Sequence, residues 1–209
     1  MIRVIVLSLA IAGSICAEEV AKPDAAALEA VLENEPENAS NVYALACLYN
    51  GQGEFQKALE LFEKRTAMGG CEEEIYHSLY RIGTIQESLE MAPELISNSF
   101  CKAFVYSPNR AEPIFRLTQY LNKKQNFPLS YTLSKLALAI SKPESGIEIE
   151  SWVYEYGLLS EFAQSAFCLG RIEESCNAYE RLLTLNLPEP LKQSIQQSLD
   201  QTKLTIQSK

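Results

Sequence analysis

Apolar residues recur at intervals of three and four along most of the chain, which is the spacing of one face of an α-helix. Within residues 152–183, two such runs flank a turn at Gly170, and this predicts two helices packed as a hairpin. A second hairpin is predicted from residue 40 onward, where Gly51 and Gly53 form the turn. Helical hairpins of this kind bury their apolar faces against one another, so the pattern predicts a stack.

Two further hairpins are predicted between these. The first covers residues 73–106. The next has Pro113 in the first turn of its first helix, where a missing N–H costs little, and its second helix is opened by Pro128 and followed by Pro143. Residues 190–208 form a final amphipathic helix of the sort that caps an open end. The predicted fold class is therefore all-α, a right-handed superhelical stack of about four helical hairpins, a solenoid, with a C-terminal capping helix.

The beginning of the chain has the layout of a secretory signal peptide. A single positive charge at Arg3 precedes an apolar run and a small-residue region that ends at Ala17. Two alternatives stay open. Lipidation of Cys16 departs from its usual context because Ile15 is large, and an uncleaved anchor needs an apolar stretch longer than this one. We expect export to the periplasm or the medium, with no membrane span after signal cleavage.

The chain divides into segments on these grounds. The order is a signal peptide (1–17), an acidic N-terminal segment with a weak helix (18–39), the repeat domain (40–188), and the capping helix and tail (189–209).

Charge narrows the function classes. The formal net charge is -9, and Asp24 and Asp200 are the only aspartates among 27 acidic residues. Glutamate tolerates a helix interior better than aspartate does, so this bias fits an all-helical chain. Phosphate backbones require clustered Lys and Arg, and the sequence therefore excludes nucleic acid as an expected partner. The sequence contains no Asp-x-Asp motif of the type that binds metals or phosphates, so we expect no cofactor and no metal.

Small and aromatic residues in the 40–64 hairpin follow a known pattern. Ala46 and Ala58 stand where two helices touch, and Tyr49 and Phe62 take aromatic positions. This pattern resembles the tetratricopeptide repeat (TPR), a helix pair of roughly 34 residues. One position departs from it, because the alanine usual later in the second helix is Arg65 here.

A more specific resemblance covers about residues 72–188. The segments R-A-E-P (110–113), Y-E-Y (154–156) and G-R-I-E-E-S (170–175) occur in this order. They resemble the TPR region that accompanies some bacterial and giant-virus glycosyltransferases. The resemblance implies a helical scaffold. Nothing in the chain resembles the nucleotide-sugar domain of those enzymes, so we expect a protein that is not an enzyme, with a helical accessory of glycan synthesis as the alternative.

Candidate chemical groups each have a simpler structural interpretation. His77 lies six residues after Cys71, but the pair straddles a helix start, which favours a surface or groove histidine over a Cys-His nucleophile. The acids 72–74 complement a helix dipole more simply than they bind a cation. Trp152 and Tyr156, with the tyrosine between them, favour core packing over a sugar-stacking platform.

The cysteines leave two interpretations open. Five remain after cleavage, with no C-x-x-C pair. An oxidising compartment would permit a disulfide, and Cys168 with Cys176 is the candidate pair because they lie near the ends of consecutive helices. The alternative is that both thiols are packed without a bond.

The first helix of each pair lines the concave groove in TPR stacks, which gives a candidate binding site. The repeat phase places these residues along it: Tyr43, Asn50, His77, Tyr80, Thr84, Glu87, Phe115, Gln119, Asn122, Gln164 and Phe167. Amides and aromatic rings can read an extended peptide, and we expect no Lys and Arg clamp there. The expected function is a non-catalytic, exported scaffold whose partner is a protein or peptide.

Overall fold

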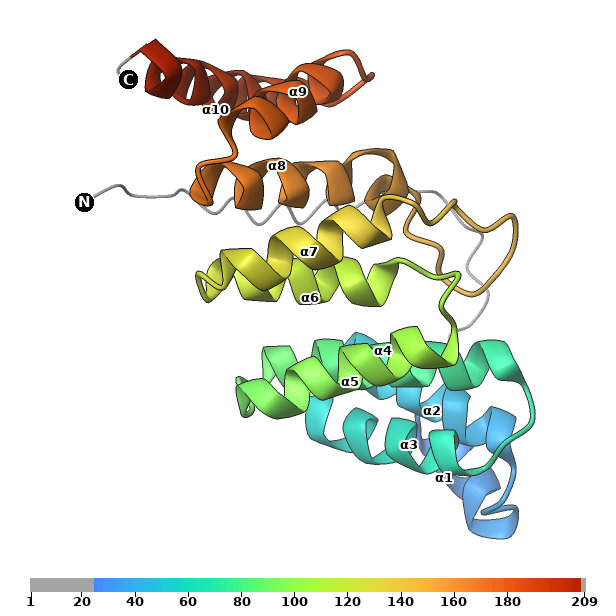
Figure 1. The fold of residues 1–209 in the computed structure, drawn as a ribbon. Coiled ribbons are helices and arrows are strands. Elements are labelled where there is room, and N and C mark those ends of the chain that lie inside the picture. Colours follow the sequence, from blue (N-terminus) through green and yellow to red (C-terminus); the bar gives the residue numbers. More distant parts are fainter. Residues whose placement is uncertain (1–24, 208–209) are drawn as a thin grey trace.

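The computed structural model describes residues 25–207, and every regular element in that range is helical (Figure 1). The α-helices are α1 (Ala25–Asn34), α2 (Ala39–Gln52), α3 (Phe55–Ala67), α4 (Glu72–Ser88), α5 (Pro93–Tyr106), α6 (Glu112–Lys123), α7 (Phe127–Ala137), α8 (Leu158–Cys168), α9 (Ile172–Leu183) and α10 (Glu189–Gln207), and a π-helical turn η1 (Val153–Gly157) precedes α8. The predicted signal peptide lies outside the described residues.

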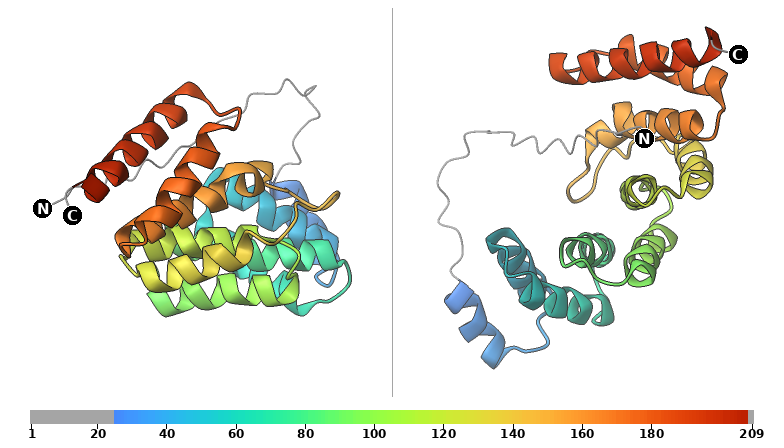
Figure 2. Two further views of the ribbon diagram at one scale, coloured as in Figure 1. Left: turned by 45° about the horizontal axis from the view of Figure 1, so that its top comes forward. Right: turned by 90° about the vertical axis from the view of Figure 1, so that its left-hand side faces the viewer.

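Consecutive helices pack as antiparallel pairs, α2 with α3, α4 with α5, α6 with α7, and α8 with α9. Helix α1 packs on α2 at one end, and α10 packs on α9 at the other. Contacts between pairs also join α2 to α4 and α6 to α8, so the first helices lie together on the inner side of an open arc (Figure 2). The predicted helical solenoid is confirmed.

Small residues set the distance between the helices. Ala46, Ala58, Ala103 and Ala163 are fully buried where helices cross. Gly83 of α4 has the same role, because a Cβ there would lie 2.7 Å from the Phe100 ring of α5. Close approach at these points lets the larger apolar side chains interdigitate, as a stack of hairpins requires.

Arg65, the departure from the TPR pattern, is only 1% exposed. Its guanidinium donates to the Glu74 carboxylate from Nη2 at 2.9 Å and from Nε at 3.0 Å, and Nη1 donates to the Gly69 carbonyl at 2.7 Å. The arginine therefore closes the connection between α3 and α4. Glu74 is an ion-pair partner as well as a first-turn acid.

The connection after α7 is longer than predicted. The helix ends at Ala137, where Ala139 and Ile140 donate to carbonyls three residues back, and Pro143 lies several residues further on. Residues 141–150, called the strap below, have no regular structure and precede the helical residues that lead into η1. Pro143 favours an extended backbone at the residue before it, so the strap leads away from the axis of α7.

No helix in the described part of the chain is both long and apolar enough to cross a membrane.

Candidate peptide-binding surface

The inner side of the arc carries a stripe of partly exposed side chains from four successive first helices. Part of the predicted groove set lies on it, namely Tyr43, Asn50, Thr84, Glu87, Gln119, Gln164 and Phe167. These residues come from α2, α4, α6 and α8, so the four hairpins contribute to one continuous surface, called the concave surface below.

The other predicted groove residues are buried, which corrects the expectation. His77 is 2% exposed and lies in a T-shaped contact with Tyr43 and Phe62. Tyr80 is buried beside Phe100, and Phe115 packs on Trp152 with ring centroids 4.9 Å apart. Asn122 is also buried. Aromatic rings gain more by burial than by lining an open surface, and the strap glutamates Glu148 and Glu150 also contact His77 and Tyr80 from the outside.

The positions beside these buried rings carry basic side chains, Arg81 of α4 and Arg116 of α6. Both are partly exposed on the concave surface. The predicted groove set, for which no Lys and Arg clamp was expected, does not include these two arginines. Arg81 and Arg116 lie three residues before Thr84 and Gln119, which is the spacing of one helical face. The sequence therefore indicated their exposure, because a charged residue next to an aromatic residue takes the solvent-facing position.

The strap crosses this surface and binds it. The Glu148 carboxylate accepts from Arg81 Nη2 and lies 3.0 Å from His77 Nε2. Tyr43 approaches the other ring nitrogen of His77, with Oη and Nδ1 2.8 Å apart. Hydrogen bonding to His77, assisted by the Arg81 charge, lowers the pKa of Glu148 to about 2. The carboxylate is therefore held in its charged form.

A second glutamate of the strap repeats the arrangement one repeat further on. Glu150 accepts from Arg116 Nη2 at 2.9 Å and from the Tyr80 hydroxyl. Arg116 Nε also donates to the Tyr80 oxygen at 2.9 Å. Burial raises the pKa of Tyr80, so its hydroxyl stays protonated and donates. The strap thus places two carboxylates on two arginines from neighbouring hairpins.

The R-A-E-P segment builds the base on which the strap rests. The fully buried Glu112 carboxylate accepts from Arg110 at 3.0 and 3.1 Å and from the Tyr154 hydroxyl at 2.6 Å. Arg110 also donates to the Ile147 carbonyl at 3.0 Å, and Glu73 accepts from the Ile147 N–H at 2.9 Å. Residues that suggested a glycosyltransferase-associated repeat therefore form a structural ion-pair network.

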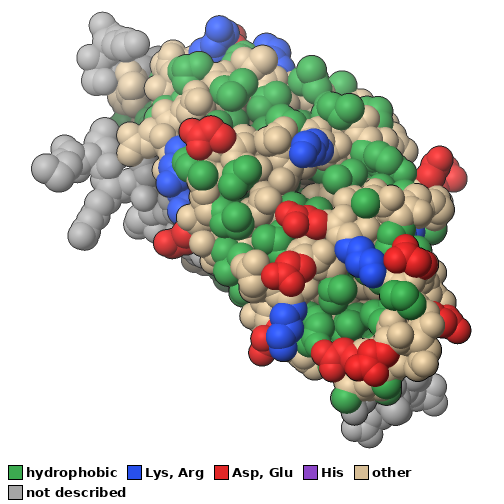
Figure 3. Space-filling model, turned by 90° about the horizontal axis from the view of Figure 1, so that it is seen from below, with side chains coloured by type: hydrophobic (Ala, Val, Ile, Leu, Met, Phe, Trp, Pro, Cys, Tyr) green, Lys and Arg blue, Asp and Glu red, His purple; other side chains and the backbone are tan. Residues whose placement is uncertain are grey.

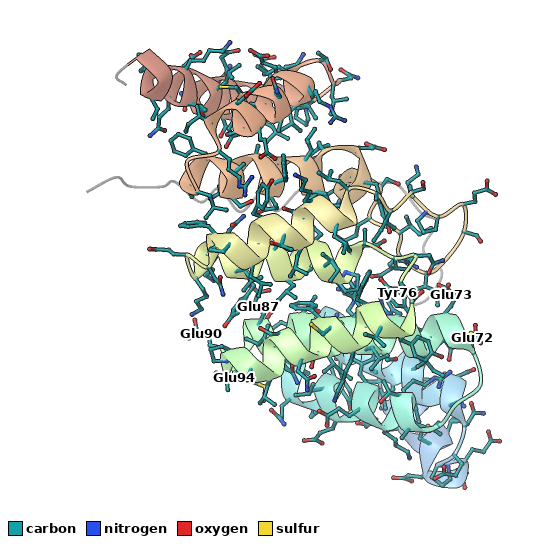
Figure 4. All side chains as sticks on the ribbon, viewed as in Figure 1. Glu72, Glu73, Tyr76, Glu87, Glu90 and Glu94 are labelled. Atoms are coloured by element: carbon teal, nitrogen blue, oxygen red, sulfur yellow. The ribbon has the colours of Figure 1, made fainter. Side chains whose placement is uncertain are left out.

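The acids at the start of α4 are shared between the helix end and this network. Glu73 and Tyr76 lie near the N-terminal end of α4, whereas Glu87, Glu90 and Glu94 gather at the opposite end of the α4–α5 pair (Figure 4). In the described part of the chain, no group of three or more His, Cys, Asp or Glu side chains is arranged to hold a metal ion.

The aromatic residues of the Y-E-Y region take part in packing. Trp152 contacts Phe115 and also Tyr156, the latter with centroids 5.9 Å apart, while the Tyr154 hydroxyl accepts from the Ala111 N–H at 3.0 Å. Their positions are coupled to the π-turn, which the sequence did not reveal. The turn brings Gly157 so close to Phe115 that a Cβ would lie 3.0 Å from the ring.

Toward the C-terminal end, the concave surface is rich in amides. Asn122 Nδ2 donates to the Glu161 carboxylate at 2.8 Å, while Asn122 Oδ1 has no hydrogen-bond partner among the described residues. Burial raises the pKa of Glu161. This end therefore contrasts with the arginine-lined part under the strap.

The cysteines in the described range are free thiols, including Cys168 and Cys176, so the candidate disulfide is not formed. Beside Cys176, Ser175 of α9 donates to the Ala163 carbonyl of α8 at 2.9 Å, and Glu180 and Lys203 are charged neighbours of the buried Cys176 thiol. Cys71 is exposed at the start of α4, whereas the ring nitrogens of His77 contact Tyr43, Arg81 and Glu148.

The outer side of the arc has a different character. A shallow hollow of about 420 Å³ lies between α4 and α5, lined by Leu79, Asn98, Cys101, Lys102, Val105 and Tyr106. A separate view from below, toward the end of the stack that carries α1, shows acidic, basic and hydrophobic side chains intermixed on the surface (Figure 3).

Comparison with known proteins supports the fold. Nineteen chains of solved structures are similar to this one. One is a kinesin light chain homologue of Podosopora anserina, described as nearly identical TPR-like repeats; it is 16% identical, with a TM-score of 0.52, over 81% of this chain and 95% of that chain. At this identity the likeness shows a TPR-like helical fold alone. No family model matches the chain. No curated protein matches it either.

Proposed function

We propose that this chain is a non-catalytic scaffold that binds an extended segment of a protein partner on its concave surface. The observation that carries the proposal is the strap, which lies on this surface and is bound through both side-chain carboxylates and main-chain groups. A bound peptide segment can be held in the same way, by main-chain hydrogen bonds together with specific side-chain contacts. The TPR-like fold supports the same role.

Export is part of the proposal. Its support is the layout of residues 1–17, with one positive charge, an apolar run and small residues before Ala17. The intact mass of the protein purified from its native host tests it. A mature chain beginning at Glu18 is the expected result, and an intact chain or one starting at a lipid-modified Cys16 contradicts it.

Affinity capture from the native host, read by mass spectrometry, tests the scaffold role. The variant Gln164→Ala with Phe167→Ala changes partly exposed residues of the concave surface that form no hydrogen bond with the strap in the described part of the chain. A matched control, Leu129→Ala with Leu136→Ala, changes exposed residues of α7. We expect the concave variant to lose a partner that the wild type and the control retain. Equal capture by all three proteins argues against the concave surface.

A helical accessory of glycan synthesis is the second candidate. Its support is the resemblance of residues 72–188 to glycosyltransferase-associated repeats, and the structure uses the resembling residues Arg110, Glu112 and Tyr154 for internal contacts. A neighbouring gene that encodes a nucleotide-sugar domain favours this candidate. Capture of such an enzyme by the concave surface would join the two roles.

A further inference from the structure

The strap also indicates which kind of segment the concave surface takes. Resting on the proposed function above, we propose that Arg81 and Arg116 form a recognition site for a short acidic segment of the partner, with two carboxylates two residues apart. In the free chain the strap occupies this site with Glu148 and Glu150.

The spacing of the two arginines carries the first step. They lie on α4 and α6, the first helices of neighbouring hairpins, and each binds one strap glutamate. In the strap, a turn at residues 147–148, with Glu148 in the left-handed region, brings one carboxylate to each arginine. A Glu-x-Glu segment that runs across the helices therefore meets both guanidinium groups at once.

The site around Arg81 is built to receive a carboxylate. Behind it, His77 Nε2 lies 3.0 Å from the Glu148 carboxylate and accepts from Arg81 Nε at 3.1 Å, while Tyr43 Oη lies 2.8 Å from His77 Nδ1. Around Arg116, the Tyr80 hydroxyl supplies a second donor beside the guanidinium. Charge-assisted hydrogen bonds of this kind favour a carboxylate over an amide.

The Ile147 backbone of the strap is anchored by Arg110 and Glu73, but the side-chain contacts of the strap with the two arginines are open to exchange. Within residues 25–207, the apolar clusters include Ile140 and Trp152 on either side of the strap but none of the residues 141–150. Glu148 adopts a left-handed backbone with φ +48°, a conformation that is unfavourable for residues with a Cβ. Its side chain is 52% exposed. Polar contacts that are partly exposed exchange readily with those of a competing ligand.

Charge limits the length of the acidic segment. On the same stripe, Glu87 lies six residues beyond Arg81 on α4. Its carboxylate repels further acidic residues along the concave surface. The ligand is therefore a short acidic pair flanked by neutral residues, like the strap itself, and not a long acidic tract.

Competition within the chain predicts the behaviour of the site. A tethered segment acts at an effective concentration in the millimolar range, so the wild-type strap weakens the apparent affinity for any ligand from outside. Neutralising the strap with Glu148→Gln and Glu150→Gln removes the competing carboxylates while leaving Arg81 and Arg116 in place.

The test uses a fluorescently labelled hexapeptide with the strap sequence Gly-Ile-Glu-Ile-Glu-Ser, residues 146–151, blocked at both ends. Binding to the full chain is measured by fluorescence anisotropy. We expect the Glu148→Gln, Glu150→Gln variant to bind it at least 10-fold more tightly than the wild type, and a peptide with both glutamates replaced by glutamine to bind neither. Adding Arg81→Gln and Arg116→Gln to the variant removes binding.

Other outcomes overturn the proposal. Equal affinity of wild type and variant means that the strap does not compete, and equal binding of the Glu and Gln peptides means that carboxylates are not read. A preference for a Lys-x-Lys peptide reverses the charge argument. If the double variant is not folded by circular dichroism, Glu148→Gln alone supplies the comparison, with a smaller expected gain of about 3-fold.

The result separates this proposal from the scaffold role. If the Gln164→Ala, Phe167→Ala variant loses a captured partner but no acidic peptide binds, the scaffold role stands and the acidic site fails. If the acidic peptide binds as expected while partner capture is unaffected by the concave variant, the amide-rich end is not part of the interface.

Discussion

The junction between the second and third hairpins and the C-terminal stack are held together by different forces. At the N-terminal ends of α4 and α6, the junction contains Arg110, Glu112 and Glu73 together with the strap. The stack of α8, α9 and α10 is apolar, with Ala166, Ala178, Leu182, Ile195 and Leu199 among its buried residues. One interface is directional and fixes the position of a loop, whereas the other is non-directional and gives stability in proportion to buried area.

This difference separates stability from function. Apolar burial joins the hairpins into one solenoid, but it does not place Glu148 and Glu150 on the concave surface. The buried ion pair does so, because Arg110 bonds to Glu112 and to the Ile147 carbonyl of the strap at the same time. Buried ion pairs commonly cost desolvation free energy, and one use for them is to specify a single arrangement.

The largest expected effect comes from breaking the polar junction. Glu112→Ala leaves the Arg110 guanidinium buried without its main partner. It also removes the acceptor for the Tyr76 and Tyr154 hydroxyls and for the Glu150 main-chain N–H. Removing one partner of a buried pair costs about 3–5 kcal/mol, so the free energy of unfolding falls by about that amount. Urea denaturation followed by circular dichroism measures it.

The control replaces both charges, as Arg110→Met with Glu112→Leu. Apolar residues of similar volume in place of a buried pair are often neutral, so this protein recovers the part of the stability that Glu112→Ala loses through the unpaired guanidinium. It should still lose the order of the strap, which hydrogen exchange at the Ile147 N–H reports. A double variant as unstable as Glu112→Ala would show that the pair is needed for stability itself.

The next effect belongs to the apolar stack. Leu182→Ala removes a fully buried side chain of α9 and leaves a cavity against α8 and α10, which costs about 3 kcal/mol. The strap lies in a different part of the molecule, so binding at the Arg81 and Arg116 site should not change while the protein remains folded. A loss of stability below about 1 kcal/mol would mean that this end of the solenoid collapses around the gap.

How much the sequence predicted follows the same division. Apolar spacing of three and four, with Gly51, Gly53 and Gly170 in turns, predicted the hairpins and their pairing, since a helical face must be buried whatever its exact neighbours. The limits of α5 agree with the predicted 93–106, and α10 with the predicted 190–208 to within a residue. Periodicity is a local property, so it can be read from one chain.

The candidate site was predictable only in part, because its key contacts join residues far apart in sequence. Glu148 meets Arg81 and Glu150 meets Arg116 through a strap that has no periodic pattern. The helical phase placed Tyr80 and Phe115 on the surface, whereas their rings are buried and the neighbouring arginines are outside. Which side of a helix faces a loop depends on tertiary packing, so hydrophobic spacing alone does not predict it.

A smaller effect is expected at Gly146, where the strap meets the ion pair. Its backbone has φ +148°, and a Cβ would lie 2.8 Å from Arg110 Nη1. Gly146→Ala strains the backbone and displaces the strap at a cost of about 2 kcal/mol. The matched control, Gly170→Ala, also has positive φ but meets no atom within 4 Å. Both lose stability, and only Gly146→Ala should alter acidic-peptide binding; equal effects on binding would contradict this account.

The smallest effect is the pH dependence that Glu148 gives to the strap. Its pKa is lowered to about 2 by the hydrogen bond with His77 and by Arg81, against an ordinary value of 4.5. A depressed pKa means that the folded state prefers the charged carboxylate, so the contribution is complete above pH 4.5 and is lost as the pH falls toward 2. Because the side chain is half exposed, solvent screening holds the contribution below about 1 kcal/mol. Urea denaturation between pH 5 and 3 should therefore show a slightly steeper loss of stability for the wild type than for Glu148→Gln.

Glu161, whose pKa burial raises, contributes in the opposite direction, since its folded state favours the protonated form. If Glu148→Gln leaves the acid slope unchanged, Glu148 is not held by Arg81 and His77 in solution, and the polar junction ends at Arg110.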